Sequence, residues 1–416
     1  MAIPFRRGPP ARSADVLPGR VMMEAVYLDH AATTPLDPRV RDAMKAAGDG
    51  IYANPSSMHL PGRKARDLVD RARHQVAELL NAKDDEIVFT SSGTEADNWV
   101  LRGVAEQWPG ACHIITSAIE HPAILETCRF LEGQGVAVTY LPVDEQGLVI
   151  PSALNKALRS DTRLVSIMAA NNVVGTLQPI DELSHIAQAR GVWFHTDAVQ
   201  TAGKIPVDLQ RQKAITFLSL SSHKIYGPKG CGALFIRSGS NLPPLIHGGG
   251  QEKGRRSSTE NIEGIVGFGA AAGIARLEMK DETLRLVRMR DDLLAELRRR
   301  IPGLYLIGHP YRRLPGHLCV GVAGRESEAI KLMLAMDEAG IAISSGSACS
   351  ASHADKPSYI LQAMGFDPVR ARGGLRITLG RFNTTDEIDH FLGVTVQVVK
   401  QLGQRTTTTI KMEDKQ

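Results

Sequence analysis

A lysine and an aspartate follow two short apolar runs near the middle of the chain. Lys224 comes shortly after residues 215–221, and Asp197 comes directly after residues 192–196. A lysine amine there can form a Schiff base with an aldehyde cofactor, and a carboxylate in so apolar a setting needs a partner such as a protonated ring nitrogen. Gln200 is spaced to hydrogen-bond the ring's phenolic oxygen. These residue types predict pyridoxal 5'-phosphate (PLP) as the cofactor.

Other lysines compete for covalent attachment to that cofactor. They are Lys204, Lys213, Lys229 and Lys253. We expect Lys224 because it follows a strand-like run, and burial with a nearby cation lowers a lysine's pKa toward the nucleophilic range. The alternative is an ordinary surface lysine before the Gly-Pro turn at residues 227–228.

A phosphate site is predicted at residues 90–95, Thr-Ser-Ser-Gly-Thr-Glu, which follow a strand-like run and open a helical pattern. Hydroxyl groups, Gly93 and the free N–H groups of a helix start bind anions. The alternative is simple N-capping by Ser92 or Thr94. Ser221 and His223, beside Lys224, are placed to complete the phosphate cup.

Two further residues are placed to contact cofactor or substrate. His121 falls at a strand-to-helix turn, where ligands bind in open α/β sheets, and its imidazole can stack on a ring and move protons. Arg376 begins a later strand, and its guanidinium can pair with a substrate carboxylate. The alternatives are a partly exposed loop histidine and a surface arginine.

Cys349 indicates which reaction the cofactor supports. It lies in residues 344–352, a run of small residues that we expect to form a mobile loop. A single thiol on a mobile loop can carry sulfur from a buried site to an external acceptor. The thiol needs nearby positive charge to become a thiolate, and His353 is the local source. The alternative is an incidental loop cysteine.

Composition limits the class of protein. The 416 residues suit two domains of unequal size, with 43% hydrophobic and 23% charged residues, as in an ordinary soluble enzyme. The formal net charge of +4 gives no general case for nucleic-acid or membrane binding, and no apolar run is long enough to span a bilayer. We therefore expect a cytoplasmic protein with no direct nucleic-acid partner.

The five cysteines argue against a disulfide framework or a structural metal site. They are odd in number, widely spaced and contain no Cys-x-x-Cys pair. Cys112, Cys231 and Cys319 adjoin strand-like runs, and we interpret them as small core residues.

Helical and strand-like patterns alternate from about residue 63 to 236. Residues 62–80 have apolar side chains at helical spacing. The strand-like runs are short and apolar on both faces, which is typical of a mostly parallel sheet covered by helices. They are residues 87–90, 113–117, 136–143, 162–170, 192–196, 215–221 and 231–236.

A smaller α+β domain is predicted after a long amphipathic helix at residues 277–300. Its expected elements are strands at 317–322, 341–344 and 375–379, a helix at 326–339 and a final helix from Thr385. Residues 267–273, Gly-Phe-Gly-Ala-Ala-Ala-Gly, imitate a dinucleotide fingerprint but follow no strand, so we reject a nucleotide site.

The predicted domains leave a loose tail at each end. Residues 1–22 are rich in arginine and proline and predict a disordered tail, with organelle targeting as the weaker alternative. Residues 36–275 form the large cofactor-binding domain. Residues 23–35 and 276–405 form the small domain with the Cys349 loop, and residues 406–416 form a polar tail.

Nine motifs in fixed order carry a family resemblance. They are YLDHAATTPLDPRV (27–40), NPSSMH (54–59), FTSSGTEADN (89–98), NNVVGTLQPI (171–180), FHTDAVQTAGKIPVD (194–208), SSHKIYGPKG (221–230), GGGQEKGRRSSTEN (248–261), SSGSACSAS (344–352) and LRITLGRFNT (375–384). The chain from Tyr27 to about His390 resembles the group I cysteine desulfurases of the NifS/IscS type, within the class V aminotransferase family. The resemblance implies the fold type I of PLP-dependent aminotransferases.

The resemblance also implies site residues. The cofactor-binding set is Gly93, Thr94, His121, Asp197, Gln200, Ser221, His223 and Lys224, with Thr259 from the other subunit of a homodimer. Asn172 and Arg376 hold the substrate carboxylate. Lys224, His121 and Cys349 are catalytic, and Cys349 becomes a persulfide.

Four positions depart from the family pattern. Val173 stands where glutamate is common, which puts support of Asn172 in doubt. His30 stands where asparagine is frequent, which puts substrate entry in doubt. Ser92 and Ser222 replace a frequent glycine or alanine.

The expected activity is cysteine desulfuration, which converts L-cysteine to L-alanine and passes the sulfur to an acceptor protein. The sequence does not identify that acceptor, and we consider an iron–sulfur scaffold, a thiolation carrier and a DNA-modification system. The alternatives are a selenocysteine lyase, another fold type I PLP enzyme, or a catalytically idle paralogue that serves as a binding partner.

Overall fold

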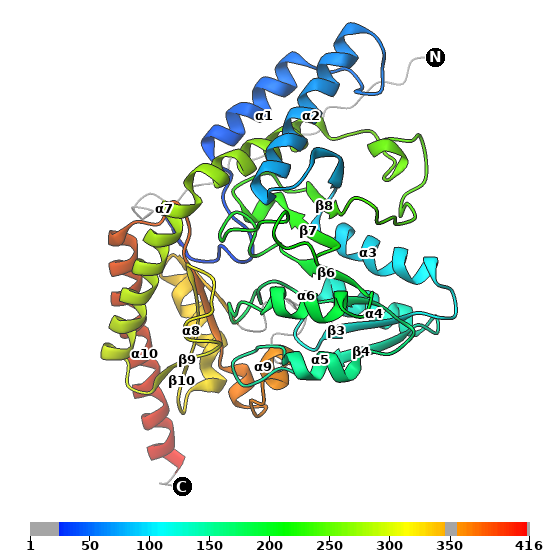
Figure 1. The fold of residues 1–416 in the computed structure, drawn as a ribbon. Helices are drawn as coiled ribbons and strands as arrows, with labels where there is room; N and C mark the ends of the chain where they lie inside the picture. Colours follow the sequence, from blue (N-terminus) through cyan, green and yellow to red (C-terminus); the bar gives the residue numbers. More distant parts are fainter. Residues whose placement is uncertain (1–24, 346–355, 414–416) are drawn as a thin grey trace, which may run out of the picture.

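The computed structural model describes residues 25–345 and 356–413, with side-chain environments up to residue 402. The Arg/Pro-rich tail and the loop that holds Cys349 and His353 lie outside the described residues. Two larger sheets with their helices, and a separate pair of short strands, make up the described part of the chain, and its longest helix runs from one of the larger sheets to the other (Figure 1). The α/β fold class is thus confirmed.

The larger sheet has seven strands and is mostly parallel, as predicted. Only β8 runs antiparallel to its neighbours β2 and β7. In spatial order the strands are β2 (Ile87–Thr90), β8 (Gly232–Ile236), β7 (Phe217–Ser221), β6 (Trp193–Asp197), β5 (Thr162–Ser166), β3 (His113–Ser117) and β4 (Ala137–Leu141).

Both faces of this sheet are buried. Successive side chains of a strand point to opposite faces, and the side chains of each face join a different core cluster. Ile115 and Val165 join the core cluster that contains residues of α2, α6 and α7, whereas Ile114 and Leu164 join the cluster with residues of α3 and α4. The first six helices are α1 (Pro38–Gly50), α2 (Leu60–Leu80), α3 (Gly93–Gln107), α4 (Pro122–Glu132), α5 (Pro151–Ala157) and α6 (Ile180–Gln188).

The smaller sheet is antiparallel and has its own apolar core. Its order is β12 (Ser344–Ser345), β13 (Leu375–Thr378), β10 (His317–Val322) and β9 (Leu304–Leu306). The helices of this part are α8 (Ala329–Glu338), α9 (Tyr359–Ala363) and α10 (Thr385–Glu413). A separate parallel pair joins β1 (Val26–Tyr27) to β11 (Ile341–Ala342).

Short 3₁₀ turns complete the described elements. They are η1 (Asp84–Glu86), η2 (Ser222–Lys224), η3 (Glu252–Gly254), η4 (Glu326–Glu328) and η6 (Arg370–Arg372). The helix expected from residue 326 therefore begins as η4 and continues as α8.

Helix α7 (Ile262–Arg300) begins well before the amphipathic segment that we predicted at 277–300. Asn261 caps it by accepting a hydrogen bond from the Gly264 N–H at 3.1 Å. The early turns contain the glycine-rich run, and a Cβ at Gly269 would lie 2.5 Å from Ala72 Cα of α2. These glycines allow close helix packing, which explains the false dinucleotide motif.

Two expectations about the small sheet and the C-terminus were wrong in detail. The predicted strand at 341–344 is two strands, because β11 pairs with β1 and β12 pairs with β13. The polar end that we expected to be loose from Thr406 is helical to Glu413. Extending an existing helix costs far less than nucleating a new one, so α10 continues through polar residues.

Cys112, Cys231 and Cys319 are buried, as predicted for core residues. Burial raises the pKa of the Cys231 and Cys319 thiols to about 12. These thiols are therefore inert packing groups at neutral pH.

Candidate active site

A cavity of about 340 Å³ lies where the carboxyl ends of the central parallel strands meet the smaller sheet. The turns after β3, β5 and β7 supply His121, Asn172 and Lys224, the last residue of β6 is Asp197, and β13 supplies Arg376. Open α/β sheets bind their ligands at this edge. Ten of the twelve residues singled out in the sequence therefore line one cavity.

The start of α3 forms one end of the cavity. Ser92 caps the helix, with its Oγ 3.1 Å from the Glu95 N–H, while Gly93 and Thr94 line the cavity. The N-capping alternative is therefore observed for Ser92, while Gly93 and Thr94 of the predicted anion site face the cavity. A Cβ on Gly93 would lie 2.7 Å from Val199 Cγ2, so glycine is required by packing.

Ser221 and His223 line the cavity beside this helix start. Burial, and then the charge of Lys224, lower the pKa of His223 to about 4. Its Nδ1 lies 3.0 Å from Thr33 Oγ1. The imidazole is therefore neutral and held in one orientation, while the helix end supplies positive potential for a phosphate.

Asp197 ends β6 with only 7% of its surface exposed. Its Oδ1 accepts a hydrogen bond from the Val199 N–H at 2.9 Å. Burial raises the pKa of this carboxyl, and the charges of His121 and Lys224 oppose that rise. A cation facing Asp197 stabilises its ionised form, which suits a protonated ring nitrogen.

His121 is the N-cap of α4 at the predicted strand-to-helix turn. Its Nδ1 accepts a hydrogen bond from the Ala123 N–H at 3.1 Å. Burial lowers the pKa of the imidazole, while the charge of Asp197 raises it. The cap fixes the ring at the cavity wall.

Lys224 ends the turn η2 directly after β7. Its Nζ donates hydrogen bonds to the carbonyl oxygens of Ala31 and Ala32, at 2.7 and 2.6 Å. The competing Lys213, Lys229 and Lys253 are exposed. Lys224 is thus the lysine that the fold brings to the cavity.

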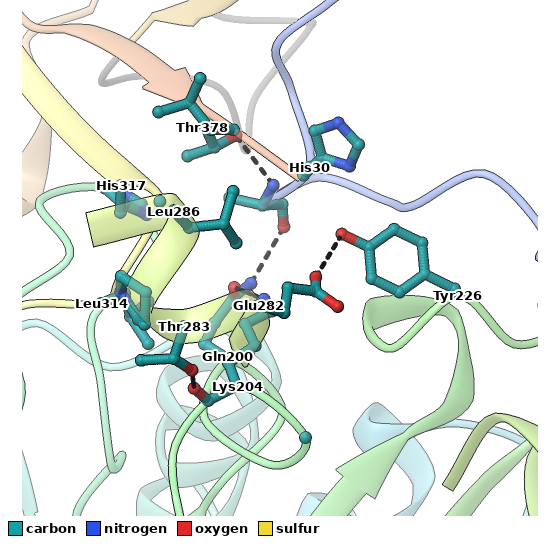
Figure 2. Close-up of a pocket in the computed structure, with 15 residues that line it drawn as sticks. His30, Gln200, Lys204, Tyr226, Glu282, Thr283, Leu286, Leu314, His317 and Thr378 are labelled. Carbon is teal, nitrogen blue, oxygen red and sulfur yellow. Dashed lines mark hydrogen bonds between the residues drawn. The ribbon is translucent and has the colours of Figure 1, made fainter. Parts of the chain in front are cut away.

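Gln200 connects this cavity to a smaller one of about 30 Å³ that contains Lys204 (Figure 2). Gln200 Nε2 donates to the Ala31 carbonyl oxygen at 2.9 Å, and Lys204 Nζ donates to Gln200 Oε1 at 3.3 Å. Burial, with the charge of Lys224, lowers the pKa of Lys204 to about 7. Lys204 therefore orients the amide of Gln200.

Arg376 is buried, contrary to the surface alternative. Its guanidinium donates to Asp29 Oδ1 at 2.7 Å and to the Asn172 carbonyl oxygen at 3.1 Å. These contacts hold the Arg376 side chain against the Asn172 main chain, and both residues line the cavity.

Two expected residues are not among those that line the cavity. Thr259 is exposed in the segment before α7, and Cys349 lies outside the described residues. Strand β12 nevertheless pairs Ser344 with Arg376. The chain therefore enters the Cys349 loop from a point beside the cavity.

Sequence reasoning missed Asp97 and the segment that contains Ala31 and Ala32. All three residues line the cavity. The signal for Asp97 was its position four residues after Gly93, which places both on one helix face. Backbone carbonyl groups such as that of Ala31 carry no residue-type signal.

The departures from the family pattern have structural explanations. Val173 is a buried core residue, and its backbone carbonyl accepts from His317 Nε2 at 2.9 Å. The segment that holds Asn172 is therefore anchored through its main chain. His30 is buried and lines the smaller cavity rather than the main one.

Comparisons with known proteins identify the family of the chain. Residues 26–391 match the family "Aminotransferase class-V". The chain is 47% identical over 393 residues to "Cysteine desulfurase IscS" of Dictyoglomus turgidum, covering 94% of this chain and 98% of that protein. A solved "NIFS-LIKE PROTEIN" superposes with a TM-score of 0.84 at 39% identity, covering 90% of this chain and 99% of the other. "SspA in complex with cysteine" has a TM-score of 0.77 at 34% identity, covering 86% and 100%.

The match over most of the chain defines the class: the protein belongs to the class-V aminotransferases, a family of PLP-dependent enzymes. Within that family it belongs to the cysteine desulfurases. Within the described residues, we find no helix with the length and apolar character needed to cross a membrane.

Proposed function

We propose that this enzyme converts L-cysteine to L-alanine and retains the sulfur as a persulfide on Cys349. The observation that carries the proposal is the convergence of Lys224, Asp197 and Arg376 on one cavity, with β12 leading from beside Arg376 into the Cys349 loop. The three side chains suit a covalent attachment point, a ring-nitrogen partner and a carboxylate clamp.

The cavity fits PLP by the chemistry of its donors. Lys224 is the proposed attachment point, Asp197 and Gln200 hold the ring, and His121 stacks on it. The phosphate is assigned to the start of α3 and its neighbours, namely Gly93, Thr94, Ser221 and His223. When bound, PLP supplies an electron sink conjugated to the substrate's α-carbon.

The protein's own residues perform the other steps. Arg376 pairs with the substrate carboxylate and Asn172 hydrogen-bonds it, which orients the α-carbon toward Lys224. The free amine of Lys224 takes the proton from that carbon and later returns it. His121 is placed to move a proton at the same face.

The sulfur step is a displacement at the substrate's sulfur atom. The Cys349 thiolate attacks that sulfur, so an S–S bond forms while the substrate's Cβ–S bond breaks. The electron pair of the broken bond remains with the three-carbon fragment, which is protonated and leaves as alanine. The sum is L-cysteine plus enzyme thiol giving L-alanine plus enzyme persulfide, and no external oxidant is needed.

We further propose a homodimer in which Thr259 of each subunit reaches the other's phosphate site. Thr259 is exposed and does not line this chain's own cavity, which supports that role. We also propose two domains, residues 36–275 and residues 23–35 with 276–405, and the presence of two larger sheets supports this division. The proposed location is the cytoplasm, and the proposed acceptor is an iron–sulfur scaffold or thiolation carrier.

The test measures alanine formed from L-cysteine with a reductant by PLP-loaded protein, comparing the intact chain with Cys349→Ala. The proposal expects alanine only from the intact chain. Equal alanine from both proteins would overturn it and favour a lyase that expels sulfur or selenium directly.

A further inference from the structure

Three carboxyl groups are buried in or beside the cofactor cavity. Asp97 of α3 is 1% exposed, Glu120 before α4 is 0% exposed, and Asp197 at the end of β6 is 7% exposed. Like charges in a dry site cannot all be ionised, because burial and mutual repulsion both disfavour the charged forms. The contacts of each group indicate where the charge resides.

Asp197 and Glu120 have compensating contacts. Asp197 accepts a hydrogen bond from the Val199 N–H at 2.9 Å, and the proton-bearing forms of His121 and Lys224 both favour its ionised form. Glu120 accepts hydrogen bonds from Ser117 Oγ at 2.5 Å and from the Met168 N–H, at 3.1 and 3.0 Å to its two oxygens. Both oxygens of Glu120 are therefore accounted for.

Asp97 has no such compensation. It lines the cavity, and its Oδ1 has no hydrogen-bond partner within the described part of the chain. The ionisable groups that act on Asp97 are Asp197 and Glu120, both acids that would add negative charge and neither of which can supply positive charge, and the remaining polar contact is the Ser219 hydroxyl. An ionised Asp97 would leave a bare charge in an apolar setting.

His195 does not supply the missing positive charge. Its Nε2 lies 3.7 Å from Asp97 Oδ1, but the ring is completely buried and burial lowers its pKa to about 3. Ser166 Oγ lies 2.8 Å from Nδ1, and Ser219 Oγ lies 2.9 Å from Nε2. A neutral imidazole that accepts from Ser166 and donates to Ser219 leaves the Ser219 proton for Asp97.

We propose that Asp97 is a positioning residue of the cofactor site that carries a proton as a neutral carboxylic acid. The Asp97–Asp197 pair then holds a single negative charge, which resides on Asp197 opposite the ring nitrogen. One negative charge balances one protonated ring nitrogen, so the dry end of the cavity is neutral when the cofactor is bound. This inference rests on the proposed role of Asp197.

Infrared spectroscopy of the PLP-loaded protein at neutral pH tests the proposal. A protonated aspartic acid has a carbonyl stretch distinct from that of carboxylates. We expect such a band, shifted by carbon-13 labelling of aspartate carboxyl groups and absent in Asp97→Asn. Glu120→Gln is the matched control, since it removes a neighbouring buried acid but leaves the aspartate band. The labelled intact protein gives the answer even if a variant fails to fold.

The dissociation constant for PLP gives a second readout. Since Asn also presents a neutral group, we expect Asp97→Asn to bind PLP at least about tenfold more tightly than Asp197→Asn, which removes the charge itself. Absence of an aspartate-derived acid band, or PLP binding weakened equally by both variants, would overturn the proposal. Neither readout depends on alanine formation, so failure of the desulfurase proposal is seen separately.

Discussion

Lys224 Nζ lies 2.7 Å from the carbonyl oxygen of Ala31, and that same oxygen accepts a hydrogen bond from the Gln200 amide. One backbone atom of the N-terminal segment therefore positions two residues assigned to the cofactor. The segment follows β1, which pairs with β11 next to the small sheet. The cavity consequently depends on two segments that are far apart in the sequence, β1 with the residues that follow it and β11.

Replacing Lys224 with alanine tests the attachment point. We expect no PLP bound covalently after borohydride reduction, and turnover of L-cysteine lower by at least about 10²-fold, because the amine is also the base. Peptide mass spectrometry locates the reduced adduct. Lys204→Ala is the matched control and keeps the adduct on Lys224. An adduct on Lys204 in the intact protein would refute this assignment.

Replacing Arg376 with lysine tests the carboxylate clamp. Lysine keeps the charge but loses the planar pair of donors, so we expect KM for L-cysteine to rise by about tenfold or more. The exposed Arg372, replaced in the same way, serves as the control. An unchanged KM in Arg376→Lys would show that the carboxylate binds elsewhere.

Replacing Gly93 with alanine tests the close approach at the start of α3. The added Cβ would lie 2.7 Å from Val199 Cγ2, whereas a Cβ at Gly393 of α10 would meet nothing within 4 Å. We expect Gly93→Ala to lower PLP affinity and stability by about 1–3 kcal/mol. Gly393→Ala, a helix-interior change, is expected to stabilise by about 0.5–1 kcal/mol. Calorimetry and PLP titration distinguish the two, and equal effects would contradict the steric argument.

Glu120 is expected to produce a pH-dependent stability. Burial raises its pKa from 4.5 to about 8. Between these values the unfolded chain has lost the proton and the folded chain keeps it, so stability falls as pH rises through the window. In Glu120→Gln we expect the decline in unfolding free energy to be shallower by up to about 1.4 kcal/mol per pH unit. Urea unfolding at several pH values measures it, and parallel slopes would mean that Glu120 is ionised in the fold.

Much of the large domain's secondary structure and most of the site followed from sequence pattern. Strands such as β3 and β10 have the predicted bounds because short apolar runs buried on both faces have few other solutions. Lys224 and Asp197 were identifiable because a charged side chain next to a buried strand needs a partner of opposite charge or a hydrogen-bonding ligand.

The remaining features depend on tertiary packing. The early start of α7 depends on close contact between Gly269 and Ala72, which no periodicity encodes. In the sequence, Asp97 resembles any polar residue of a helix. Its burial beside the cavity follows only from the packing of α3 against β6 and β7. The split of β11 from β12 is set by their different partners.

Mass spectrometry of the Cys349 peptide tests the central claim most directly. The PLP-loaded protein is incubated with L-cysteine without reductant, alkylated and digested. We expect Cys349 to carry one additional sulfur atom, while the four buried cysteines, Cys112, Cys128, Cys231 and Cys319, stay unmodified. Alanine production with no added sulfur on Cys349 would contradict the account.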